Sequence, residues 1–65
     1  MSPRENLLDA SCRLTMQAHR ANEHGDREEG MRCGWMAMYL DARARGHSKH
    51  NASMRANVYE RRGDL

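Results

Sequence analysis

The apolar residues of this chain recur mostly every three or four positions, the spacing that gathers side chains on one side of an α-helix. The densest stretch is Met31 to Arg45, with the sequence MRCGWMAMYLDARAR. On a helix its apolar positions form two groups on roughly opposite sides: Met31, Trp35, Met38, Tyr39 and Ala42 in one, and Cys33, Met36, Ala37, Leu40 and Ala44 in the other. A helix that is apolar on two sides has to be covered on two sides. We therefore expect this segment at the centre of a bundle.

A narrower stripe of small apolar residues precedes this stretch and predicts a first helix over about residues 3–24. The stripe consists of Leu7, Ala10, Leu14, Ala18 and Ala21. Ser2, Pro3 and Glu5 form a helix start, because Ser can cap the helix, Pro suits its first position and Glu completes a capping box. Gly25 fits the left-handed position that ends such a helix.

A second helix start, Asp26 to Glu29, follows at once, and it predicts a second helix over about residues 27–45. Helices joined by two or three residues form an antiparallel hairpin. If the turn is centred near Gly25, residues whose numbers sum to about 50 lie level across the hairpin. This register brings Leu14 close to Met36.

The remainder of the chain predicts a third helix over about residues 49–62. Gly46 ends the second helix, and either Ser48 or Asn51 can cap the third. Its apolar content is thin and divided between two faces. We therefore predict an all-α fold with a single small domain over residues 1–65: an antiparallel two-helix hairpin plus a short third helix, completed by homodimerisation into a small bundle.

Composition strengthens the expectation of a partner. The 65 residues include eight Ala but no Phe, no Ile and one Val, so we expect Leu, Met, Trp and Tyr to carry the packing. A chain this short usually needs a disulfide, a metal, a second copy or a partner. Cys12 and Cys33 would be offset by about 7 Å along the predicted hairpin, too far for an unstrained disulfide. A second copy of the chain or another protein is therefore the remaining means of stabilising the fold.

Charge is unevenly distributed along the chain. Residues 1–30 carry four basic and six acidic groups, a net charge of −2, while residues 31–65 carry seven basic and three acidic groups, a net charge of +4. The basic half is mild support for an anionic partner. No apolar run approaches the roughly 18 residues of a membrane span, and the N-terminus lacks the apolar core of a signal peptide. We expect a cytoplasmic protein with reduced cysteines and no membrane contact.

Histidine and cysteine raise the question of a metal site. His47 and His50 have HxxH spacing, His19 and His24 have HxxxxH spacing, and the two cysteines are isolated. Structural zinc needs paired ligands at close spacing, so we expect no metal and no other cofactor. A chain without a phosphate loop or a nucleophile motif also has little room for a shielded pocket. We expect neither an enzyme nor a small-molecule substrate.

The run from Ala42 to Ala52, with Gly46 and Ser48 between them, resembles the turn region of bacterial repressor-type helix-turn-helix motifs. In that family the second helix enters the major groove and its early residues read bases. The resemblance places these residues near DNA: Lys49, His50, Asn51, Ser53 and Arg55.

The same run departs from the family at Asp41, Arg45 and His47, where the family has apolar residues. An Ala-xxx-Gly helix end is also common for capping reasons alone. A small DNA-binding regulator using residues 42–62 is therefore our alternative hypothesis. Its nucleic-acid contacts would be Arg43, Arg45, Lys49, Asn51 and Arg55.

The leading hypothesis is a small non-catalytic regulatory or inhibitory protein that docks a helical face on a larger protein, as small proteins of phages or plasmids do. It follows from the apolar surface of the second helix, which exceeds what the first helix can cover. The expected partner-binding residues are Trp35, Met36, Met38, Tyr39 and Leu40.

Overall fold

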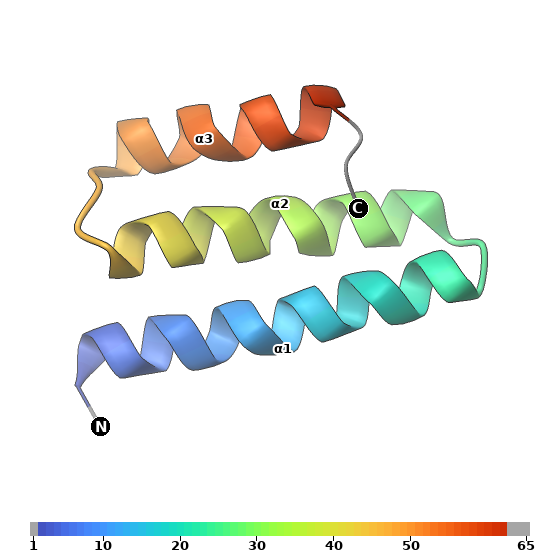
Figure 1. Ribbon diagram of the computed structural model, residues 1–65, viewed down its shortest axis with the longest axis horizontal. Helices are drawn as coiled ribbons and strands as arrows, with labels where there is room; N and C mark the ends of the chain where they lie inside the picture. Colours follow the sequence, from blue (N-terminus) through green and yellow to red (C-terminus); the bar gives the residue numbers. More distant parts are fainter. Residues whose placement is uncertain (1, 63–65) are drawn as a thin grey trace.

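Three antiparallel helices lie side by side in the computed structural model, with the second helix in the middle (Figure 1). The structure describes residues 2–62. Helix α1 is Pro3–Glu23, α2 is Arg27–Ala44 and α3 is Lys49–Arg62. Helix α2 contacts both neighbours, whereas within residues 2–62 α1 and α3 do not contact each other. The all-helical prediction and the central position of α2 are confirmed.

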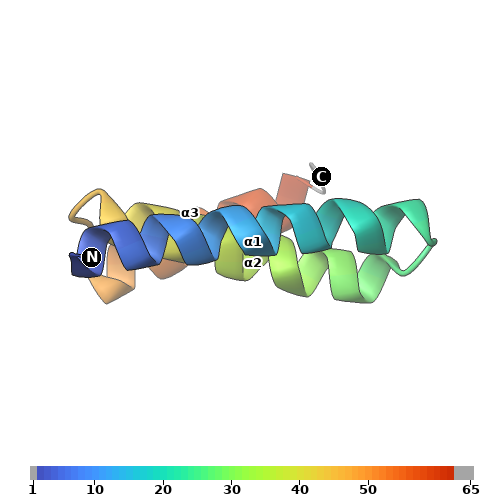
Figure 2. The ribbon, with the colours of Figure 1, turned by 90° about the horizontal axis from the view of Figure 1, so that it is seen from below.

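The helices form one layer. The molecule measures 34 × 25 × 12 Å. A width of 25 Å fits three helices spaced about 8–10 Å apart, and a helix with its side chains is about 10–12 Å thick. Figure 2 shows the layer along its edge, with α1 in front of α2 and α3. Both faces of the layer are therefore open in a single chain, and the predicted homodimerisation stays a prediction.

Local hydrogen bonds explain why the helices begin and end where they do. Ser2 and Glu5 form the reciprocal capping box at the start of α1, and the Asp26 side chain accepts from the Glu29 amide at the start of α2. Ser48 caps α3 by accepting from the Asn51 amide, which resolves the two alternatives for that cap. Gly25 has a φ of +81°, the left-handed conformation expected at the first turn.

The buried residues are almost all small, and this corrects the expected core. Seven of the eight alanines are buried, together with Cys33 and Ser11. No large side chain of residues 2–61 is fully buried. The fully buried core is therefore made of small residues, and not of the Leu, Met, Trp and Tyr residues that we expected there. Several larger side chains, among them Leu14 and Trp35, are half-buried, and the exposed ones are Leu8, Met16, Met36, Met38, Met54 and Val58.

The α1–α2 contact has the predicted register. The Ser11 hydroxyl donates to the Ala37 carbonyl across 2.8 Å, and these residue numbers sum to 48. Gly30 is buried against the side chain of Asn22, where an added Cβ would collide with the amide. The hairpin is therefore held by close backbone approach and one buried side-chain hydrogen bond.

The α2–α3 contact combines small residues with one polar link. Ala52 and Ala56 are completely buried along it. The half-buried Trp35 donates its indole N–H to the Asn57 side chain across 2.9 Å, and its ring stacks on Tyr39 with centroids 5.5 Å apart. Helix α3 is thus tied to α2 near the middle of the layer.

Candidate functional site

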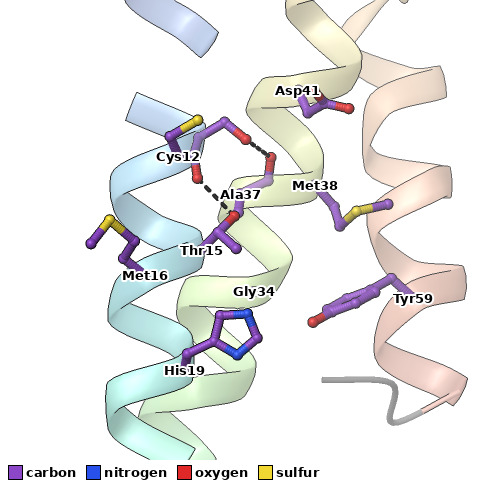
Figure 3. A pocket seen from close by; sticks show the side chains of 10 residues that line it. Cys12, Thr15, Met16, His19, Gly34, Ala37, Met38, Asp41 and Tyr59 are labelled. Carbon is purple, nitrogen blue, oxygen red and sulfur yellow. Dashed lines mark hydrogen bonds between the residues drawn. The ribbon is translucent and has the colours of Figure 1, made fainter. Parts of the chain in front are cut away.

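A groove of about 660 Å³ lies on one face of the layer, with α2 between α1 and α3 (Figure 3). It is lined by Ser11, Cys12, Thr15, Met16 and His19 of α1, by Gly34, Ala37, Met38 and Asp41 of α2, and by Tyr59 of α3. The rings of His19 and Tyr59 extend toward each other across α2 near Gly34. Because Gly34 and Ala37 have little or no side chain, α2 leaves space between the two flanking helices.

Two rows of residues with the same spacing build this groove. The α1 row is Cys12, Thr15, Met16 and His19, and the α2 row is Gly34, Ala37, Met38 and Asp41. Positions i, i+3, i+4 and i+7 fall on one side of a helix, so each helix presents one continuous stripe to the groove. The α1 stripe mixes polar and apolar residues, and this is why a search for hydrophobic periodicity misses it. Its spacing is the signal that could have found it.

The groove carries little charge. Asp41 is the only Asp, Glu, Lys or Arg among its lining residues, and its carboxylate lies 3.1 Å from the guanidinium of Arg45. This ion pair is exposed and contributes at most about 1 kcal/mol to stability. Its main effect here is to neutralise the single acid within the same chain. The groove is therefore an apolar surface with a few neutral polar groups.

A second cavity of about 350 Å³, the Trp35–Met36 cavity, has a different character. It is lined by Glu28, Met31, Arg32, Trp35, Met36 and Glu60. Met36 precedes Met38 of the groove by two residues, a rotation of about 200° around α2. The two methionines thus lie on opposite faces of the layer. Three charged residues surround the apolar centre of this cavity.

The structure separates the five predicted partner-binding residues. Trp35 and Met36 line the Trp35–Met36 cavity, and Tyr39 stacks on Trp35. Leu40 is half-buried and follows Met36 by one helical turn, which places it on the same side of α2. Met38 instead lines the groove. The sequence pattern grouped Trp35 with Met38 on one side of the helix, whereas the structure places Trp35 beside Met36 in one cavity and Met38 in the groove.

The predicted nucleic-acid contacts are distributed around the α2–α3 connection. The Arg43 guanidinium donates to the His47 carbonyl, and Arg45 pairs with Asp41. Arg45 and Arg55 share a small cavity of about 90 Å³. The other two contacts, Lys49 and Asn51, belong to the first turn of α3.

The arrangement of α2 and α3 differs from the one that the helix-turn-helix resemblance implies. The two helices of that motif cross at about 90–120°. Helices α2 and α3 instead run antiparallel, side by side along the layer (Figure 1). Helices α2 and α3 therefore show no such crossing, and the DNA-binding alternative stays a prediction.

The two cysteines are free and differ in their surroundings. Cys12 is exposed at the groove, whereas Cys33 is buried. Burial raises the pKa of the Cys33 thiol, and its hydrogen bond to Glu29 acts in the same direction. A thiol reagent should therefore react with Cys12 and not with Cys33.

The described part of the chain has neither a cluster of metal ligands nor a helix that could span a membrane. Residues 2–62 contain no group of three His, Cys, Asp or Glu side chains placed to hold a metal ion. None of the three helices has the length and apolar content to cross a bilayer. Comparisons of the chain with protein-family models, with curated proteins and with solved structures find no match.

Proposed function

We propose that this chain is a small non-catalytic regulatory or inhibitory protein that docks one helical face on a larger protein. The observation that carries the proposal is the exposure of large apolar side chains on a layer one helix thick. Among residues 2–62 these are Leu8, Met16, Met36, Met38, Met54 and Val58. Domains normally bury such residues between two packed layers, and a contiguous patch of exposed apolar surface marks an interaction site.

A protein surface suits the chemistry of these residues. Four of the six are methionines, whose unbranched and polarisable side chains adapt to irregular apolar surfaces. Proteins that bind by repacking against a partner use such Met-rich surfaces. The exposed methionines therefore favour a protein partner over a small ligand that needs a rigid pocket.

The Trp35–Met36 cavity is our candidate for the docking surface. Trp35 is positioned by Asn57 and by stacking on Tyr39, so little side-chain entropy remains to be lost on binding. Trp is enriched among the residues that dominate binding energy. An apolar centre surrounded by Glu28, Arg32 and Glu60 also matches the usual interface of apolar core and polar rim.

Affinity capture with matched variants tests the docking function. The baits are the wild-type chain, Met36→Glu and Met54→Glu, which makes the same change on α3; Met36 is 42% and Met54 54% exposed. We expect one protein recovered with wild type and Met54→Glu but lost with Met36→Glu, and direct binding of that purified protein then gives the affinity. Equal recovery by all three baits would remove the Trp35–Met36 cavity from the proposal. Failure of wild type to bind any protein would refute the docking function.

Self-association is the second part of the proposal. A face of 34 by 25 Å has a footprint of about 850 Å², close to the roughly 800 Å² that each partner buries in a standard protein interface. One face of the layer is thus large enough for a stable contact with a second copy. We expect equilibrium sedimentation to show a dimer at micromolar concentration, and a folded monomer at those concentrations would contradict this expectation.

A further inference from the structure

The two faces of the layer differ in how well each could meet its own copy. In a two-fold dimer the same patch of both chains comes together, so an unbalanced charge on that patch would lie opposite the same charge on the second copy and repel it. The groove has one charged lining residue, Asp41, which Arg45 neutralises. The Trp35–Met36 cavity has two acids and one Arg among its six lining residues. The groove is therefore the face that tolerates self-contact.

Packing favours the same face. Gly34 and Ala37 are buried small residues on α2, and the groove above them has a volume of about 660 Å³. A helix laid across small residues can approach closely, as α1 already does at Gly30. The α1 row and the α2 row have identical spacing, so two copies of this face can interdigitate along matching helical stripes.

We infer that a second copy of this chain binds in the groove lined by α1, α2 and Tyr59, which leaves the Trp35–Met36 cavity free for a foreign protein. The inference rests on the proposed self-association and assigns it to one face. It converts a single helical layer into a two-layer dimer with six helices. Cys12 and Met38 are then covered in the dimer, and Met36 stays on its outer surface.

A pair of matched variants distinguishes the two faces. Met38→Glu and Met36→Glu make the same substitution on one helix, at side chains that are 36% and 42% exposed. Burying an unpaired carboxylate in an interface is strongly unfavourable. By equilibrium sedimentation we expect Met38→Glu to be a folded monomer and Met36→Glu to remain a dimer.

Cys12 supplies a second measurement that needs no substitution. Cys12 and Cys33 fall on different tryptic peptides because Arg13 and Arg32 lie between them, so mass spectrometry can follow each thiol separately. At a concentration about 100 times the dissociation constant, mass action leaves less than about a tenth of the chains monomeric. Alkylation of Cys12 by iodoacetamide should then slow by about tenfold relative to dilute protein. The buried Cys33 should stay slow at both concentrations.

The outcomes separate this inference from the proposals on which it builds. A wild-type dimer whose Cys12 reacts equally fast at both concentrations would overturn the groove assignment while self-association stands. Dissociation by Met36→Glu instead of Met38→Glu would overturn it in the same way. A wild-type monomer would overturn self-association itself, whereas docking on another protein is decided by the capture experiment. If Met38→Glu does not fold, the Cys12 measurement on wild type decides the matter.

Discussion

The close approach of α1 and α2 predicts that enlarging a buried alanine is more damaging than changing an exposed methionine. Ala18 is the sharpest case because its side chain is fully buried and its carbonyl lies beside Gly30 of α2. Ala18→Leu adds three carbon atoms where no space is left. Overpacking of this kind costs about 1–3 kcal/mol, and the helices must move apart to accommodate it.

That cost is large for this chain. Native proteins have a stability of roughly 0.05–0.15 kcal/mol per residue, which for 65 residues gives about 3–10 kcal/mol. In a domain of this size each kcal/mol changes the Tm by about 4–8 °C. We therefore expect Ala18→Leu to lower the Tm by at least about 4 °C, and a cost near 3 kcal/mol would unfold a chain at the low end of this range.

Thermal unfolding followed by circular dichroism measures the effect. Gln17→Leu is the matched control, since it places the same side chain on the same helix at the neighbouring exposed position. The control should unfold within a few degrees of wild type. An Ala18→Leu variant as stable as the control would refute the alanine-mediated packing of α1 on α2. Each variant should be melted at two concentrations, so that a change in self-association is recognised.

Three further predictions concern other parts of the molecule. Trp35→Ala should lower the free energy of unfolding in urea by about 2 kcal/mol, less than the roughly 3–5 kcal/mol of a fully buried Trp. Trp35 is only half-buried, but the variant also loses the hydrogen bond to Asn57. An unchanged urea midpoint would contradict this. Because the fold raises the pKa of Cys33, the protonated thiol favours the folded state at neutral pH, and this contribution to stability should disappear as the pH rises through the pKa of the folded thiol. Cys33→Ala should therefore weaken the loss of stability at alkaline pH, and a stability profile against pH identical to that of wild type would contradict this. Labelled duplex DNA should bind weakly at about 150 mM salt, with little effect of Lys49→Ala plus Arg55→Ala, whereas tight sequence-dependent binding would favour the DNA-binding alternative.

The features predictable from sequence are those with local causes. Ser2 with Glu5, Asp26 and Gly25 fix the helix ends through contacts within a few residues, so their patterns can be read directly. The short turn then determines the hairpin register, as the bond between Ser11 and Ala37 shows. No knowledge of the third helix is needed for either prediction.

The composition of the core and the position of the groove could not be read in the same way. Periodicity reports which residues are apolar but not how close two helices approach, and here the approach is close enough to favour Ala over Leu and Met. The groove depends on α3 contributing Tyr59 opposite an α1 stripe that contains Thr15 and His19. That combination is set by tertiary structure, so the pattern of a single helix cannot reveal it.

The alanine-lined contacts between the helices have a consequence for how this protein can change over evolution. The alanines Ala18, Ala52 and Ala56 are fully buried, whereas Met16 and Met54 are more than half exposed. Substitutions at displayed positions can therefore accumulate with little loss of the helical framework. The side chains that this framework displays, and with them its binding specificity, can therefore change while packing constrains the buried small residues.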